Sequence, residues 1–399
     1  MIVLGGAGGG AGGGAGGGAG GGAGGGAGGG AGGGAGGGAG GGAGGGAGGG
    51  TSHAGDGPST ILSDALITTH DAITPYWDGS VTNPGEPTLK RNEDYLAELR
   101  YGTQVQILAA RLKQKVWVEL GIDAGCTADI RDGVADVCVA DDCKILTMKR
   151  PPAEYFKADL KWLRAYDDLR ADRMLEIYQQ VGDVMSFFGA LSMLDRGRRE
   201  KTLGFLTAVH NLAIFVHSQV KYFCRAPRPI DFAMEVQPMI QTPDHSSFPS
   251  GHATEAFAIA TVLYRFLTGQ NAVHGINASA LPFRLAHRIA VNRTVAGVHF
   301  PVDSFAGAML GCQIGEFAYA VAQGTTVPKL VFERDDPGTN PTPDFLLHCG
   351  LADALQGGEG CCTPGLDRVV QHMFDEAKDE WPELADDCPP QSGGYNGAR

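Results

Sequence analysis

The chain has 399 residues, of which 64 are glycine, and a formal net charge of −13 at pH 7. This negative charge argues against a general binding surface for nucleic acid or anionic membranes. After the first six residues, the unit Ala-Gly-Gly-Gly repeats without interruption from Ala7 to Gly50. Such a segment carries no side chain able to form a core, so we expect residues 1–50 to be a flexible tether.

The rest of the chain, roughly 350 residues, is long enough for one large domain or two small ones. We expect residues 51–325 to form the main, helical domain. Residues 326–399 are acidic, contain Cys, Pro and Gly, and are expected to pack on it as an extension. No ordinary signal peptide is visible. The uncharged stretch Thr202–Val220 contains several polar residues, which favours a core helix over a membrane span.

Apolar periodicity predicts a mainly α protein with a helix bundle at its centre and weak strand signals throughout. Residues 121–149 are expected to be irregular, and residues 224–250 form a proline-rich loop. Gly297 is expected to end a helix. The expected helices are residues 92–120, 153–181, 184–194, 202–223, 251–267, 283–296, 302–322 and 366–380.

Nine cysteines are scattered without a Cys-x-x-Cys pair, so a zinc knuckle is not expected. Two groups lie in loop-like segments and can either form disulfides or stay reduced: Cys126, Cys138 and Cys143, and Cys349, Cys361, Cys362 and Cys388. His210 and His217 share a helix face, but no third ligand is evident. We expect these two histidines and His287 to have structural roles.

The stretch Phe248-Pro249-Ser250-Gly251-His252 ends the proline-rich loop and precedes an apolar helix. A helix that begins here presents free backbone N–H groups and a positive dipole end, which together can bind an anion. Ser250 adds a hydroxyl donor, and Gly251 allows the backbone to approach a ligand closely. His252, in the first helical turn, supplies a group that can carry a proton.

Two further groups of charged residues flank this helix start in the sequence. Lys221 lies near the end of the preceding helix, and Arg228 follows in the loop. Arg293 ends a later helix, and His299 precedes the next one. Asp303 follows His299 by four residues, a helical neighbour spacing, so it can bond one ring nitrogen and leave the other free.

Together these residues supply three cations, a hydroxyl, backbone N–H groups and two histidines, a set that suits a tetrahedral or trigonal-bipyramidal oxyanion. The two arginines can bind its oxygens in a bidentate way, while Lys221 acts as a point charge. One histidine can bind the central atom while the other transfers protons. Each residue alone would more often be solvated or structural; their conjunction predicts an anion site.

The blocks Lys221-x6-Arg228-Pro229, Pro249-Ser250-Gly251-His252 and Arg293-x5-His299-x3-Asp303 resemble the signature of the type 2 phosphatidic acid phosphatase and vanadium haloperoxidase superfamily. The resemblance implies a helix-bundle core that holds phosphate or vanadate. His299 would be the covalent nucleophile of a phosphatase or the axial vanadium ligand of a peroxidase, and His252 the acid–base residue. The oxygens would be bound by Lys221, Arg228, Ser250, Gly251 and Arg293.

Three features favour a haloperoxidase over a phosphatase. No membrane span is expected, and the domain is longer than the compact bacterial acid phosphatases. His245 also stands where the algal bromoperoxidases have a histidine and the fungal chloroperoxidases a phenylalanine. Both of those groups have a tryptophan three residues before the lysine, whereas this chain has Ser218. That departure puts the halide preference in doubt.

The leading hypothesis is a vanadium-dependent haloperoxidase that uses vanadate, hydrogen peroxide and a halide, bromide rather than chloride, to halogenate an organic acceptor. Its catalytic residues would be His252, His299, Lys221, Asp303 and His245, with His299 as the metal ligand. Two alternatives stay open: a soluble acid phosphatase that forms phosphohistidine at His299, and a glycine-rich surface protein whose domain only binds an anion. The sequence leaves the compartment open and allows a homo-oligomer.

Overall fold

The computed structural model describes residues 60–381, apart from residue 74 and residues 82–88, 122–132 and 339–341. The Ala-Gly-Gly-Gly repeat, Cys126 and Cys388 lie outside the described residues. The chain is mainly helical, as expected. Its helices are α3 (Thr60–Ile73), α4 (Asn92–Glu98), α5 (Tyr101–Lys113), α6 (Ala153–Tyr166), α7 (Arg170–Gly182), α8 (Met185–Ser192), α9 (Glu200–Cys224), α10 (Pro229–Phe232), α11 (Gly251–Thr268), α12 (Ala272–Asn277), α13 (Leu281–Val295), α14 (Pro301–Gln323), α15 (Leu351–Gln356) and α16 (Arg368–Asp379).

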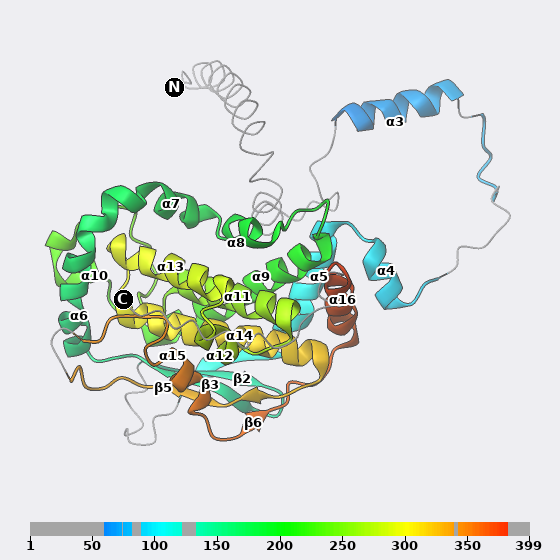
Figure 1. Cartoon of the computed structure of the whole chain (residues 1–399). Coiled ribbons are helices and arrows are strands. Elements are labelled where there is room, and N and C mark those ends of the chain that lie inside the picture. Colours follow the sequence, from blue (N-terminus) through cyan, green and yellow to red (C-terminus); the bar gives the residue numbers. More distant parts are fainter. Residues whose placement is uncertain (1–59, 74, 82–88, 122–132, 339–341, 382–399) are drawn as a thin grey trace, which may run out of the picture.

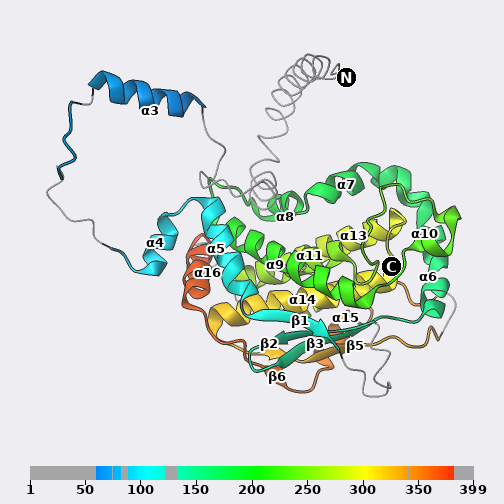
Figure 2. The same ribbon diagram turned by 180° about the vertical axis from the view of Figure 1, so that it is seen from behind.

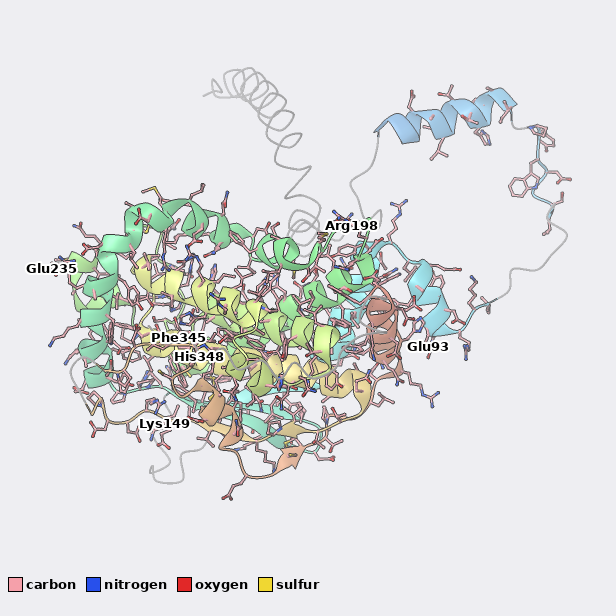
Figure 3. All side chains as sticks on the ribbon, in the orientation of Figure 1. Glu93, Lys149, Arg198, Glu235, Phe345 and His348 are labelled. Atoms are coloured by element: carbon pink, nitrogen blue, oxygen red, sulfur yellow. A yellow bond between two sulfur atoms is a disulfide. The ribbon has the colours of Figure 1, made fainter. Side chains whose placement is uncertain are left out.

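Helix α11 lies at the centre of the bundle and packs against α9, α13 and α14. These four helices form a layer with α7 on one side and a β-sheet on the other (Figure 1). Side chains fill the space between the layers (Figure 3). Most residues of α14 are buried, as are most of α11, so both helices are apolar on nearly every face. The helix that begins at Gly251 is therefore held rigidly inside the protein.

Three glycines at four-residue spacing let α14 pack closely on α11. A Cβ atom at Gly307 would lie 2.5 Å from the carbonyl oxygen of Ser250, and one at Gly315 would lie 2.6 Å from Cβ of Thr261. A Cβ atom at Gly311 would collide with the carbonyl oxygen of Thr254. The backbones of the two helices therefore touch along their length, which fixes α14 against the start of α11.

Residues 116–120 and 134–149 differ from the expectation, because they contain three strands. The sheet has the order β1-β2-β3-β5, in which β5 runs parallel to β3 and the other pairs are antiparallel (Figure 2). The expected helix over residues 92–120 is two short helices followed by β1. Buried Val, Ile and Leu residues of these strands pack on α9 and α14, and such residues favour strands. The strands are β1 (Val116–Leu120), β2 (Val134–Val139), β3 (Cys143–Lys149), β4 (Val327–Pro328), β5 (Leu330–Phe332) and β6 (Cys361–Cys362).

The C-terminal segment contacts the sheet and the bundle at several points. A disulfide joins Cys143 to Cys362, one cysteine from each of the two groups. The Glu380 carboxylate accepts hydrogen bonds from the first backbone N–H groups of α9, at Lys201 and Thr202 (2.7 and 2.8 Å). This carboxylate satisfies donors at a helix start that has no side-chain cap of its own.

Two helical segments are long and apolar enough to cross a membrane by length and composition alone. They are Glu200–Phe232, which includes α9, and Pro301–Gln323, which is α14. Of their most apolar windows, 67% and 94% are buried inside the protein. The helix over residues 202–223 was expected to be a core helix, and most of α9 is buried here.

We expect Gly311→Ala to lower the free energy of unfolding by about 1–3 kcal/mol, because the added methyl group meets backbone of α11 that cannot move aside alone. Gly102→Ala is the matched control, since nothing lies within 4 Å of its Cβ position in α5. Alanine there should be neutral or stabilising. Urea unfolding monitored by circular dichroism measures both changes; equal stability of the two variants would contradict the close packing.

Candidate active site

The loop after α9 and the loop before α11 are bonded to each other. The backbone N–H of Ser247 donates to Ala226 O (3.0 Å), and the N–H of Ala226 donates to Ser246 Oγ (2.8 Å). Lys221 Nζ also donates to the backbone carbonyls of Ser246 and Ser247, at 2.8 and 3.3 Å. The first sequence block is therefore attached to the second one by backbone and side-chain hydrogen bonds.

Asp303 connects the second block to the third. Its backbone carbonyl accepts a hydrogen bond from the N–H of Ser250 (2.9 Å). Its Oδ2 atom lies 2.5 Å from Ser247 Oγ, 2.9 Å from the N–H of Phe300 and 3.1 Å from His299 Nδ1. All these groups can donate to a carboxylate, so Asp303 fixes the imidazole of His299 against the start of α11.

The tautomer of His299 follows from its two neighbours. Nη1 of Arg228 lies 3.2 Å from Nε2 of His299, and a guanidinium can only donate. Nε2 is therefore the acceptor, and the ring proton sits on Nδ1, facing Asp303. Burial first, and then the charges of Arg228 and Lys221, hold the pKa of His299 well below its usual value. The ring thus presents an unprotonated Nε2 atom, as a nucleophile or ligand requires.

Arg293 is buried and is oriented by α7. Its Nη2 atom donates to Ile177 O and to Gln180 Oε1, both at 3.1 Å. Its Nε and Nη1 atoms are buried without a hydrogen-bond partner among the described residues. Buried donors of this kind carry a free-energy cost that a bound oxyanion would remove. The donor set therefore fits phosphate or vanadate, which would be held by the residues that the sequence predicted.

His252 is held by a backbone carbonyl. Its Nε2 atom lies 2.9 Å from the carbonyl oxygen of Gln180, which can only accept, so Nε2 carries a proton and Nδ1 is left to exchange one. Burial, and then the charge of Arg293, lower the pKa of His252 to about 4. A bound anion would raise this pKa by stabilising the imidazolium.

Two other ionisable groups of the site also have shifted pKa values. Burial, with the nearby charge of Arg228, lowers the pKa of Lys221 to about 7. Burial raises the pKa of Asp303 to about 6, although hydrogen bonds from Ser247 and Phe300 oppose this rise. Both shifts reflect charges that have been moved out of water.

Two cavities flank the predicted site. One of about 720 Å³ is lined by His252 and Gln180, and also by His210, His217 and Glu255. The other, about 520 Å³, is lined by Lys221, Arg228 and His245. Ser218 lines both cavities. His245 is exposed and contacts Arg228 (Nδ1 to Nη2, 3.0 Å), so it neighbours the anion-binding residues through that arginine.

The sequence did not single out Gln180, Ser247 or Glu255, and it assigned His210 and His217 to structural roles. Both histidines bond the carboxylate of Glu255, with each Nε2 atom 3.0 Å from a separate oxygen. A side chain at position 251 would also crowd a neighbour within the protein, because a Cβ atom there would lie 3.1 Å from Cε1 of His217. Glu255 could have been found from its position three residues after His252, because that spacing places the two side chains close together on a helix.

The family model for the PAP2 superfamily matches residues 202–326, which include all three blocks. The chain is 32% identical over 143 residues to decaprenylphosphoryl-5-phosphoribose phosphatase of Mycobacterium tuberculosis, from strains CDC 1551 / Oshkosh and ATCC 25618 / H37Rv. Each match covers 35% of this chain and 71% of the relative.

Two solved structures are also similar, at lower identity. A bacterial vanadium-dependent iodoperoxidase matches at 15% identity and a TM-score of 0.32, over 41% of this chain and 48% of that one. A transmembrane PAP2-type phosphatidylglycerolphosphate phosphatase from Bacillus subtilis matches at 23% identity and a TM-score of 0.33, over 41% of this chain and 84% of that one. The chain thus spans about half of the iodoperoxidase.

We expect Arg293→Lys to weaken phosphate binding by about tenfold or more, because a lysine cannot supply the two unpartnered donors in a fixed plane. The measurement is the rise in melting temperature with added phosphate, which reports binding to the folded state. Arg284→Lys is the control, since Arg284 is an exposed residue of the same helix. An unchanged phosphate response in Arg293→Lys would remove Arg293 from the site.

Proposed function

Because the chain belongs to the PAP2 superfamily, we propose that it is a phosphatase that hydrolyses phosphomonoesters through a phosphohistidine at His299. The observation that carries this proposal is the tautomer of His299, whose Nε2 atom is unprotonated and faces Arg228. That arrangement gives the imidazole a nucleophilic lone pair beside a group that binds phosphate oxygens.

In the first step, Nε2 of His299 attacks phosphorus and the ester P–O bond breaks. The departing alkoxide takes a proton from Nδ1 of His252, while Nε2 of that ring keeps its bond to Gln180 O. Asp303 stabilises the positive charge that develops on His299. The charges of Arg228, Arg293 and Lys221 stabilise the equatorial oxygens of the transition state.

In the second step, a water molecule attacks phosphorus and gives its proton to His252. The P–N bond breaks, which releases orthophosphate and restores both histidines. The cavity of about 720 Å³ beside His252 has room for the leaving group and then for this water. Its lining combines apolar residues such as Val184 and Phe215 with polar ones such as Asn211, so a leaving group with both characters would fit.

We propose a phosphatase in preference to the haloperoxidase that the sequence favoured. The curated relatives at 32% identity are phosphatases. His245, the residue that favoured vanadate, contacts Arg228 and is exposed. Its contact is therefore equally compatible with phosphate chemistry.

We expect the purified protein to hydrolyse a phosphomonoester such as p-nitrophenyl phosphate, and His299→Ala to lower kcat by at least about a thousandfold by removing the nucleophile. Rapid acid-free quenching with a ³²P-labelled substrate should trap label on the wild type and none on His299→Ala. His287→Ala is the control histidine, because His287 bonds Phe345 O away from the site. Hydrolysis without label on His299 would contradict the covalent route.

The haloperoxidase is the second candidate, because the sequence places a histidine, His245, where the algal bromoperoxidases have one. Vanadate would be held by Lys221, Arg228, Ser250, Gly251, Arg293 and His299, and it would supply a Lewis-acidic centre for peroxide activation.

We expect vanadate to inhibit phosphate-ester hydrolysis competitively, because both oxyanions fit the same donors. Halogenation of a phenol reporter by vanadate, peroxide and bromide, together with negligible ester hydrolysis, would instead establish the haloperoxidase. His245→Phe then tests the basis of that candidate: it should lower halogenation if His245 contributes, while changing ester hydrolysis little.

A further inference from the structure

Glu255 forms a closed cluster with two histidines beside the anion-binding residues. Its two carboxylate oxygens lie 3.0 Å from Nε2 of His210 and 3.0 Å from Nε2 of His217. His210 and His217 are seven residues apart on α9 and so lie on one face of that helix. Burial alone would raise the pKa of the Glu255 carboxyl, but the bonds from both histidines hold it well below its usual value.

The cluster lies against the first turn of α11. Glu255 follows His252 by three residues, a spacing that places the two side chains on neighbouring positions of one face. A Cβ atom on Gly251 would lie 3.1 Å from Cε1 of His217 and 3.5 Å from Oε1 of Glu255. The glycine therefore leaves room for the imidazole–carboxylate pair directly beside the helix start that is expected to bind the anion.

A carboxylate at this position repels an oxyanion bound by the neighbouring cations, and it attracts a positive charge on a neighbouring imidazole. The groups that act on His252 come from each element around it: Gln180 O from α7, His217 from α9, Glu255 from α11 and Arg293 from α13. Arg293 and His217 oppose a charged imidazole. Among these groups Glu255 is the carboxylate, and its negative charge favours the protonated, charged form of His252.

We infer that Glu255 is a positioning residue for the acid–base step, in which its carboxylate, held between His210 and His217, stabilises the imidazolium of His252. The assignment of the acid–base step to His252 rests on the proposed function, whereas the coupling between Glu255 and His252 does not. Glu255 thus weakens the binding of the anion, but it helps His252 to remain protonated, and so able to donate a proton, beside the charge of Arg293.

The variant Glu255→Gln tests this inference, because the amide has nearly the same size as the carboxylate but carries no charge. Its oxygen can still accept a hydrogen bond, and its nitrogen can donate one. With saturating inorganic phosphate, the pKa of His252 should fall by at least about half a unit, since a charge at this distance acts through a protein interior. NMR titration of ¹³C-labelled histidine, assigned with His252→Gln, measures this shift directly.

The same variant should bind phosphate more tightly, by roughly threefold, because a repelling charge has been removed. The alkaline limb of the kcat–pH profile should move to lower pH, because His252 must be protonated to serve as the acid and loses its proton earlier. A purely structural role predicts the opposite for binding: a disturbed site would bind phosphate more weakly and leave the pKa of His252 unmoved.

Asp183→Asn is the matched control, since Asp183 lines the same cavity but caps the start of α8 through Ser186. It should leave the pKa of His252 unchanged. Equal shifts in both variants, or no shift in Glu255→Gln, would overturn the inference. Absence of phosphatase activity together with a shifted His252 pKa would overturn the proposed function alone, because the NMR and binding measurements do not depend on turnover.

Discussion

The site depends on the hydrogen bonds that converge on Asp303. Its Oδ2 atom accepts from His299, Ser247 and the N–H of Phe300, and its backbone carbonyl accepts from the N–H of Ser250. Burial of this carboxylate is unfavourable, as the rise of its pKa to about 6 indicates, so these donors are what keep it in place. Asp303 thereby holds the ring proton of His299 on Nδ1, together with Arg228 at Nε2, and also sets the distance between α14 and the start of α11.

That distance also depends on the three glycines of α14. Larger residues at Gly307, Gly311 or Gly315 would push the backbone of α11 outward, and the N–H of Ser250 would then separate from the carbonyl of Asp303. The close packing of α14 on α11 therefore also fixes the geometry of the polar site between them. It explains why the site lies in the most buried part of the molecule, where a displacement of one helix cannot be absorbed by loops.

The sequence predicted the bundle helices well, because these depend on local periodicity, and the three charged blocks could be recognised from their short spacing. It missed the sheet, since every residue of β2 is buried, which removes the alternating pattern of a strand, and since the partner of β3 at the sheet edge, β5, lies far away along the chain. It also missed Gln180, whose bond to Arg293 joins residues 113 positions apart. Such partners carry no local signal. Glu255 did carry one, its spacing from His252, but a glutamate in an apolar helix is not distinguishable from a surface residue until α9 is placed beside it.

The charges of the site point to proton uptake when an anion binds. Lys221, Arg293 and His252 have pKa values lowered to about 7, 10 and 4, in each case mainly by burial. A bound oxyanion raises all three, and near neutral pH this adds protons mainly to Lys221, whose pKa lies nearest to neutrality. On the proposed mechanism, the rise in the pKa of His252 favours the protonated imidazole that the leaving group requires. Glu255 acts in the same direction on His252 before and after the anion arrives, while it opposes the binding of the anion itself.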